Sequence, residues 1–217
     1  MIERDGYPLV LLSGALATAV LAASHYLELG WLLGIAIFLY LLTLYVAYFF
    51  RSPDRVAPDD DSLTLAPSDG LTLGVEKLES YPGFDGPVYR ISIFLSVLDV
   101  HVNWVPATGK IESSQYFPGK FHKAFTDKAS EENERTEITI RTKHGRVEFK
   151  QIAGILARRI VCRLKAGQEV VAGEKFGMIK FGSRTEVVIS ATAEILVRTG
   201  DKVKGAVTPL ARMSVNS

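Results

Sequence analysis

The stretch KFGSRTEVVI, residues 180–189, reads as a β-strand with an unusual beginning. Its last three residues, VVI, are β-branched, and such side chains favour the pleated surface of a sheet. Gly182 stands at the head of the strand, where a glycine often marks a bulge or the close approach of another backbone. The stretch therefore predicts a β-rich fold in which a flexible glycine and a nucleophilic side chain, Ser183, begin a strand.

The composition of the chain excludes several classes of protein. With 217 residues and a net charge of +1, the chain suits one domain plus an appendage. No basic stripe dominates it, so we expect no nucleic-acid partner. The single cysteine, Cys162, excludes an internal disulfide and a cysteine-rich metal site, and its apolar surroundings predict a small buried hydrophobe. The sequence holds no nucleotide-binding or metal-binding motif, so no metal is predicted.

Residues 1–50 hold two apolar runs that predict a membrane-associated helical hairpin. Neither run, 8–23 or 29–50, contains a charged residue. The second has 22 residues and would extend about 33 Å as a helix, enough for a hydrocarbon core of roughly 30 Å, whereas the first lies at the low edge of the spanning range. A shallow re-entrant pair is the alternative. A cleaved signal peptide fits poorly, because the N-terminus is not strongly positive and a longer apolar run follows.

The charges that flank the two runs predict their orientation. Arg4 precedes the hairpin, Arg51 and Arg55 follow it, and the connecting turn carries no lysine or arginine. Positive residues beside membrane segments stay in the cytoplasm. We therefore expect a protein of the cell membrane whose main domain, residues 51–217, lies on the cytoplasmic face in contact with membrane lipid.

Residues 51–217 predict a mostly β domain. After a linker rich in proline and aspartate, short strand-like runs alternate with glycine turns. The predicted strands cover residues 71–78, 88–95, 109–115, 136–142, 147–155, 160–164, 175–180, 185–190 and 193–197. The segment SVLDVHVN, residues 96–103, is expected to form a short helix or a bend. The predicted fold class is therefore mainly β, a compact barrel-like or sandwich-like domain preceded by the hairpin.

Two segments near the C-terminus favour a different interpretation. The two segments share one pattern: a glycine turn, then a polar residue followed by valine, then another glycine. They are KAGQEVVAGEKFGMI and VRTGDKVKGAVTPLA. The pattern resembles the hairpins of biotinyl and lipoyl carrier domains. A membrane-tethered carrier or binding module without catalysis is therefore the alternative function. Such a carrier needs a lysine at an exposed hairpin tip, and Lys202 is the candidate.

The pair Gly182-Ser183 suits a rearrangement of the backbone. Attack of the Ser183 hydroxyl on the Gly182 carbonyl would turn the peptide into an ester. β-Elimination would then cut the chain, and hydrolysis of the new end would leave a pyruvoyl group with loss of ammonia. Glycine suits this position because no Cβ obstructs the attack. The reaction also needs a base for the hydroxyl and donors for the oxyanion.

Two residues upstream are candidates to assist this chemistry. Asp69 lies in APSDG, just before a predicted strand, although an Asp-Gly pair is also typical of a simple turn. His101 lies in LDVHVNW and is flanked on both sides by apolar residues, as no other histidine of the four is. A pocket there could tune its pKa, although a structural histidine would show the same pattern.

Five motifs follow one another in a fixed order: LAPSDG, SVLDVHVNWVP, FPGKF, DKASEENER and KFGSR. Together they resemble the short form of the phosphatidylserine decarboxylase family, over about residues 51–217. The resemblance implies a lyase, made as a proenzyme, that cuts itself into chains 1–182 and 183–217. The two chains would stay together, and the pyruvoyl group made from Ser183 would be the covalent cofactor.

The resemblance also implies the reaction and its residues. The substrate would be phosphatidylserine or a related serine phospholipid, decarboxylated to phosphatidylethanolamine through a Schiff base with the pyruvoyl group. Asp69 matches the aspartate of the family's ADG-type turn, and His101 matches the first histidine of its DxH motif. Diacyl and ether-linked lipids share the head group, so both remain open. Candidates to bind the phosphodiester or the carboxylate, with solvated surface charge as the alternative, are Lys120, Arg135, Arg158 and Arg159.

Two positions depart from the pattern of the larger family members. Those members carry a second histidine three residues after the first, assigned to self-cleavage, and here that position is Trp104. They also have threonine where this chain has Arg184. An Asp-His-Ser relay therefore cannot be transferred whole. Either His101 serves both steps, or Asp69 acts with other groups.

Overall fold

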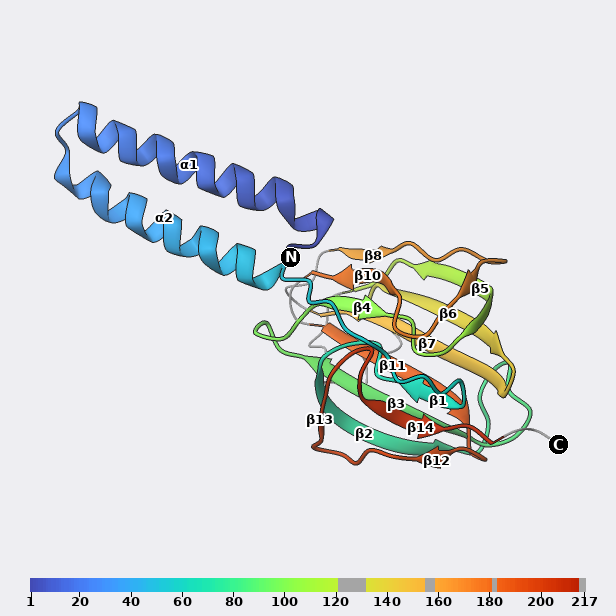
Figure 1. Ribbon diagram of the computed structural model, residues 1–217. Helices are drawn as coiled ribbons and strands as arrows, with labels where there is room; N and C mark the ends of the chain where they lie inside the picture. Colours follow the sequence, from blue (N-terminus) through green and yellow to red (C-terminus); the bar gives the residue numbers. More distant parts are fainter. Residues whose placement is uncertain (121–131, 155–158, 181–182, 215–217) are drawn as a thin grey trace. The chain divides into compact units, whose positions relative to one another are not determined.

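The computed structural model describes residues 1–120, 132–154, 159–180 and 183–214 (Figure 1). The chain forms two compact units, Met1–Pro53 and Asp54–Ser217. Each unit has its own architecture and is described by itself.

The first unit is the predicted helical hairpin. A short 3-10 turn, η1 (Arg4–Gly6), leads into α1 (Tyr7–Tyr26), and α2 (Gly30–Phe49) returns antiparallel to it. Each α-helix has 20 residues and is therefore about 30 Å long. α1 is longer than its apolar run because the helix continues to Tyr26. Both helices are long and apolar enough to cross a membrane.

Small residues bring the two helices together. Ala17 of α1 and Ala36 of α2 are fully buried, and the Thr18 hydroxyl lies 2.9 Å from the Tyr40 hydroxyl. Small side chains allow helix backbones to approach closely, as in membrane bundles. The N-terminus is fastened to the end of α2, because the amide of Glu3 donates to the Phe50 carbonyl at 2.8 Å.

The second unit is built around a sheet of eight antiparallel strands in the order β13-β2-β3-β11-β7-β6-β5-β9. The strands are β2 (Gly70–Leu78), β3 (Val88–Leu95), β5 (Gly109–Phe117), β6 (Arg135–Thr142), β7 (Gly145–Ala153), β9 (Glu169–Val170), β11 (Ser183–Ser190) and β13 (Lys202–Val203). β11 lies between β3 and β7 and pairs with both along nearly its whole length. This is the strand that KFGSRTEVVI predicts.

Two small sheets accompany the large one. One has the order β1-β14-β12, formed by β1 (Leu63–Leu65), β14 (Pro209–Arg212) and β12 (Glu194–Ile195). The other has the order β4-β10-β8, formed by β4 (Val102–Trp104), β10 (Lys175–Ile179) and β8 (Ile160–Cys162). The second sheet matters for the site, because β10 leads directly towards β11.

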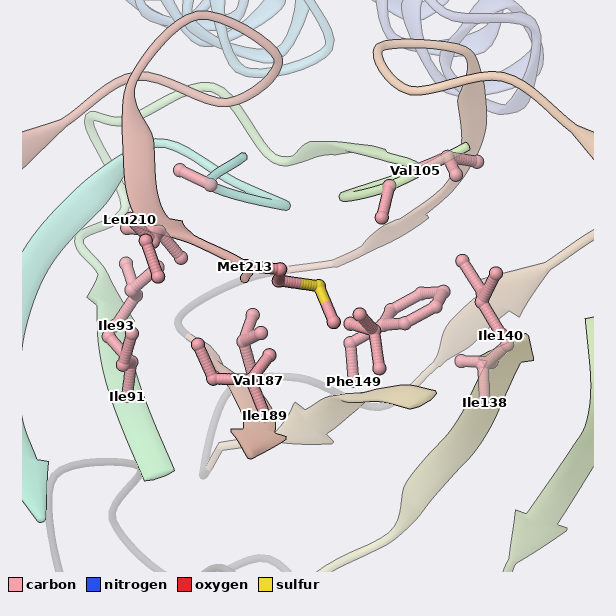
Figure 2. Close-up of a cluster of buried hydrophobic side chains, with 14 of the residues drawn as sticks. Ile91, Ile93, Val105, Ile138, Ile140, Phe149, Val187, Ile189, Leu210 and Met213 are labelled. Carbon is pink, nitrogen blue, oxygen red and sulfur yellow. The ribbon is translucent and has the colours of Figure 1, made fainter. Parts of the chain in front are cut away.

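The main core fills the space between the large sheet and these segments (Figure 2). Inward-facing side chains of β3, β11, β7 and β6 meet Leu210 of β14 and Met213 just beyond it. Phe149 of β7 packs edge-on against Phe176 of β10, with ring centroids 5.3 Å apart. Buried apolar side chains from these layers hold the sheet in its curled form.

The mainly β prediction is confirmed, with corrections in detail. Of the two alternatives for residues 96–103, the bend is confirmed: a turn at 97–98 and a bend at Asp99 precede β4, which begins at Val102. The run 193–197 contains only a two-residue strand. β7 starts two residues before the predicted strand, and the predicted end at Ile155 lies outside the described residues. Strands β1, β4, β9, β13 and β14 have two to four residues each, too short for a local pattern to reveal.

Candidate functional site

Ser183 is the first residue of β11, at one end of the central strand. Its Cα partners are Leu95 at the end of β3 and Ala153 at the end of β7. The residue is fully buried, and its Oγ has no hydrogen-bond partner among the described residues. A buried hydroxyl without a partner costs free energy, so the burial of Ser183 needs an explanation other than stability. Gly182 lies outside the described residues.

His101 lies beside the strand that leads to Ser183. Its carbonyl accepts a hydrogen bond from the amide of Ile179, the last residue of β10, at 3.3 Å. The imidazole is fully buried, and its Nδ1 lies 3.0 Å from the Asp99 carbonyl. Because a carbonyl only accepts hydrogen bonds, this contact places a proton on Nδ1.

The strand geometry of β4 separates two groups of side chains. Val100, Val102 and Trp104 pack in one small apolar cluster with Ala206. Alternation along the strand then sends Asn103 to the opposite face, and His101 directly precedes the strand. The side chain of Asn103 meets Gln151 of β7, whose Nε2 donates to Asn103 Oδ1 at 2.8 Å. β4 therefore presents the Asn103 amide to the sheet that contains Ser183.

Asp69 is held by an arginine rather than by a histidine. Arg55 forms a two-pronged ion pair with its carboxylate, and the Arg55 Nη2–Asp69 Oδ2 distance is 2.9 Å. The amide of Gly205 also donates to Asp69 Oδ1 at 2.9 Å, and Arg55 donates to the Gly205 carbonyl at 2.8 Å. Asp69 and Arg55 are 15% and 11% exposed, so this pair is largely shielded from water. It joins three distant segments of the second unit.

Trp104, at the position where the resemblance led us to expect a second histidine, contacts this ion pair. The Arg55 guanidinium lies 4.3 Å from the centre of the indole ring, within cation–π range. The indole also packs so closely on Gly205 that an added Cβ there would lie 2.4 Å from it. In this chain Arg55 therefore occupies the place between Asp69 and residue 104.

A hydroxyl pair links the Asp69 turn to the strand of Ser183. Ser68 Oγ lies 2.8 Å from Thr185 Oγ1, and both residues are buried. Thr185 lies on the same face of β11 as Ser183, two residues along the strand. The structure thus brings Asp69 and His101 to the end of the sheet where β11 begins, through Ser68 and through Ile179.

The opposite face of β11 carries a buried ion pair beside Ser183. Arg184 Nη2 lies 2.8 Å from Glu186 Oε1 and donates to Ser92 Oγ at 2.6 Å. The two charged side chains are only 4% and 1% exposed. Arg184 therefore anchors the strand on the face away from the Ser183 hydroxyl.

The basic residues predicted to bind the phosphodiester or the carboxylate differ in their local surroundings. Lys120 is exposed and pairs with Glu132 at 3.0 Å. Arg135 pairs with Glu137 at 2.7 Å and lies over the Phe117 ring. Arg159 is exposed, and its carbonyl accepts from the Lys180 amide at 3.2 Å, three residues before Ser183. Arg158 lies outside the described residues. Arg159 is thus the described candidate linked most directly to the segment that enters β11.

The structure also places the two other residues that the sequence analysis considered, Cys162 and Lys202. Cys162 is half-buried against the main core, and burial raises the pKa of its thiol. Lys202, the residue that a carrier would need at a hairpin tip, lies in strand β13 and pairs with Leu71 of β2. Its position does not favour a carrier.

Sequence reasoning missed three residues of this region: Arg55, Asn103 and Gln151. Gln151 had a usable signal, because VEFKQIA alternates apolar residues at 147, 149 and 153 with a polar residue at the inward position 151. Asn103 would have stood out two residues from His101 had β4 been predicted. Arg55 offered no local signal, since its contact depends on chain packing.

Comparison with known proteins places the chain in a family. A family model described as phosphatidylserine decarboxylase matches residues 42–211. The chain is 41% identical over 210 residues to a protein of Syntrophus aciditrophicus, and the match covers 96% of each chain. It is 39% identical over 213 residues to a protein of Chlorobium limicola, covering 98% of this chain and all of the relative.

A protein of Pelodictyon phaeoclathratiforme is 41% identical over 213 residues, again covering 98% of this chain and all of the relative. All three relatives carry the name phosphatidylserine decarboxylase proenzyme. The family model spans well over half of the chain, and the identities extend almost from end to end. The chain therefore belongs to the phosphatidylserine decarboxylase family, a family of decarboxylase proenzymes.

Proposed function

We propose that this protein is a proenzyme that cuts itself before Ser183 and then decarboxylates phosphatidylserine, or a related serine phospholipid, to phosphatidylethanolamine. The observation that carries the proposal is the Ser183 hydroxyl, fully buried and without a hydrogen-bond partner in the described part of the chain. It stands at the head of the central strand in a chain related to proenzymes. A nucleophile in this setting is already desolvated before the reaction.

In the maturation step, Ser183 Oγ bonds to the preceding carbonyl carbon and the hydroxyl proton passes to a base. The ester that results is then opened by elimination. His101 is the proposed base, because its Nδ1 is engaged by the Asp99 carbonyl and its backbone is tied to the segment that enters β11. Asp69 instead holds Arg55 and Gly205, which supports a positioning role.

A pyruvoyl group made from Ser183 would supply an electron sink for the carbanion that decarboxylation leaves at Cα. The carbanion must then receive a proton. His101 is the proposed donor, because imidazole is the side chain that most readily gains and loses a proton near neutral pH. The exposed Arg159, next to the segment that enters β11, is the proposed contact for the phosphodiester or the carboxylate.

The hairpin suits a lipid substrate. We propose that residues 1–50 hold the protein in the cell membrane and that the β domain, residues 51–217, works on the cytoplasmic face. The two apolar helices, long enough to cross a bilayer, support the attachment. Arg4, Arg51 and Arg55 beside the hairpin support the orientation.

Intact-mass spectrometry of the purified protein tests the proposal. We expect two chains that stay associated, and the smaller, residues 183–217, has 217 − 182 = 35 residues. Its N-terminus should be blocked to Edman sequencing. Reduction with cyanoborohydride in the presence of phosphatidylserine should attach the lipid to the small chain.

The Ser183→Ala variant is the matched control, because it removes a single oxygen from a buried position. It should remain one chain, release no carbon dioxide from phosphatidylserine, and acquire no lipid on reduction. Wild-type protein that stays intact yet decarboxylates the lipid would refute the proposed cofactor. Cut protein that releases no carbon dioxide from any serine phospholipid would refute the reaction.

A further inference from the structure

The amide of Asn103 is a buried hydrogen-bond donor without an acceptor. Asn103 is fully buried, and its Nδ2 has no partner among the described residues. Its Oδ1, by contrast, accepts from Gln151 Nε2 at 2.8 Å. Buried polar groups in folded proteins are nearly always paired, so each exception needs an explanation.

The neighbours of Gln151 determine which way both amides point. Gln151 Nε2 also lies 3.2 Å from the Val161 carbonyl, which can only accept. Turning the Gln151 amide around would set two oxygens against each other, so the nitrogen must face Val161 and Asn103. The same reasoning then fixes Asn103, whose oxygen must face Gln151. Its two N–H bonds are therefore directed away from Gln151.

The sheet register places this donor on the side of the sheet that Ser183 faces. Gln151 is the Cα partner of Thr185, and residues paired in this way present side chains on the same face. Ser183 lies on that face too, one same-face step or about 7 Å along the strand. Asn103 reaches this face through its hydrogen bond with Gln151, and β4 pairs with β10, the strand that precedes β11 in the chain. In the described part of the chain, three buried polar atoms of these neighbouring elements lack partners: Ser183 Oγ, Asn103 Nδ2 and Gln151 Oε1.

We propose that Asn103 is a catalytic residue of self-cleavage and that Gln151 is the positioning residue that orients it. The inference rests on the proposed cleavage before Ser183. When Ser183 Oγ bonds to the preceding carbonyl carbon, the π electrons of the C=O bond move to oxygen, and Asn103 Nδ2 donates a hydrogen bond to that oxyanion. The hydroxyl proton passes through the base to the departing amine of Ser183, so the acyl shift balances without a co-reactant. Preorganised amide donors of this kind stabilise charge that develops only in the transition state.

The test is the rate of cleavage of freshly made full-length precursor, followed by intact mass. Asn103→Asp keeps the size of the side chain but replaces the donor with an acceptor, and we expect cleavage to slow by about 10²–10³-fold. Gln151→Met keeps the length but removes the orienting contact, and we expect a smaller loss, about tenfold. Thr64→Val is the matched control, because Thr64 is also fully buried and its Oγ1 also lacks a partner, but it lies in β1 of a separate sheet. It should cleave at the wild-type rate.

Hydroxylamine separates a chemical role from a structural one. Hydroxylamine cleaves esters, so it should speed chain cleavage in a variant that is blocked after the acyl shift. It should not speed cleavage of Asn103→Asp, because in that variant the ester itself forms slowly. A folded Asn103→Asp protein that cleaves itself at the wild-type rate would overturn the inference. So would one that, with hydroxylamine present, is cleaved as fast as the wild-type protein under the same conditions. If Asn103→Asp does not fold, a Gln151→Met protein that cleaves at the wild-type rate would do the same. Failure of the proposed function is distinct, since wild-type protein would then show no cut before Ser183.

Discussion

At the scale of single residues, the most consequential contact is the ion pair between Asp69 and Arg55. Both carboxylate oxygens already accept hydrogen bonds, from Arg55 and from the Gly205 amide. Gly205 belongs to the segment after Ser183, whereas Asp69 and Arg55 precede it. The contact therefore ties together the two chains that cleavage before Ser183 would produce. An aspartate engaged in this way fits a positioning role better than that of a general base.

We predict that Arg55→Met destabilises the folded protein by about 2–3 kcal/mol, because it leaves a largely buried carboxylate without its charged partner. The free energy of unfolding should be measured in the Ser183→Ala background, which keeps each variant as one chain. Asp69→Asn retains the shape and an acceptor for the Gly205 amide. The double variant should therefore be no less stable than Arg55→Met alone. If the double variant instead loses the sum of the two single-variant decreases in the free energy of unfolding, the two side chains act independently.

At the scale of elements, β6 and β7 carry a polar network on the face opposite to the main core. Glu137 of β6 accepts from Arg135 at 2.7 Å and from Lys150 of β7 at 2.9 Å. Burial raises the pKa of the Glu137 carboxyl, but the hydrogen bonds from Arg135 and Lys150 outweigh it and hold the pKa below its usual value. The same carboxylate and Tyr81 raise the pKa of the Lys150 ammonium against the opposing effect of burial.

This network predicts a pH-dependent contribution to stability. A carboxyl whose pKa is lowered by folding stabilises the protein above its unfolded pKa of about 4.3, and this contribution is lost as the pH falls through the lower folded pKa. Glu137→Gln should therefore lower the free energy of unfolding by about 1–2 kcal/mol at pH 7, and the difference should shrink below about pH 4. Denaturant unfolding at each pH, in the Ser183→Ala background, measures this difference in the free energy of unfolding.

Glu169→Gln is the control for that experiment, because Glu169 is exposed on β9. It should change stability little at either pH. A loss in Glu137→Gln that is equally large at pH 3 and pH 7 would mean that the carboxylate charge is not what stabilises the strands.

At the scale of the whole molecule, the segment after Ser183 cannot be a separate domain. β11 lies between β3 and β7, β13 pairs with β2, and β14 pairs with β1, so each of these strands borders a strand from the first 182 residues. A chain of 35 residues is too short to bury a core of its own. The sheet must therefore form before any cut, and the pairing would hold the two chains together afterwards.

The division into two units predicts that cleavage does not need the hairpin. Deleting residues 1–53 removes the unit Met1–Pro53 but keeps Arg55 and the whole β domain. We expect this variant to cut itself at about the wild-type rate and to lose its sedimentation with membranes, because the exposed apolar helices are gone. Activity on detergent-dispersed lipid should persist.

The full-length Ser183→Ala variant serves as the reference for membrane binding, since it should sediment with membranes although it is uncut. A deletion variant that sediments as strongly as this reference would place the anchor in the β domain. A deletion variant that folds but no longer cuts itself would show that the hairpin takes part in maturation.

The sequence by itself determined the features that neighbouring residues encode. Unbroken apolar runs specified α1 and α2, β-branched runs specified the long strands, and the predicted strand 88–95 coincides with β3. The Gly-Ser pair and the motifs around Asp69 and His101 were also readable, because each is a short contiguous pattern. Such features depend on local propensity and periodicity.

Only the tertiary structure decided what those residues contact. Arg55 and Asp69 are 14 residues apart, and Asn103 and Gln151 are 48 apart, so neither pair leaves a local pattern. The faces of β4 became known only when its pairing with β10 gave it a register, which separated Trp104 from Asn103. A strand of two to four residues gains its stability from partners distant in sequence. Its existence, and the site that it completes, therefore follow from packing rather than from propensity.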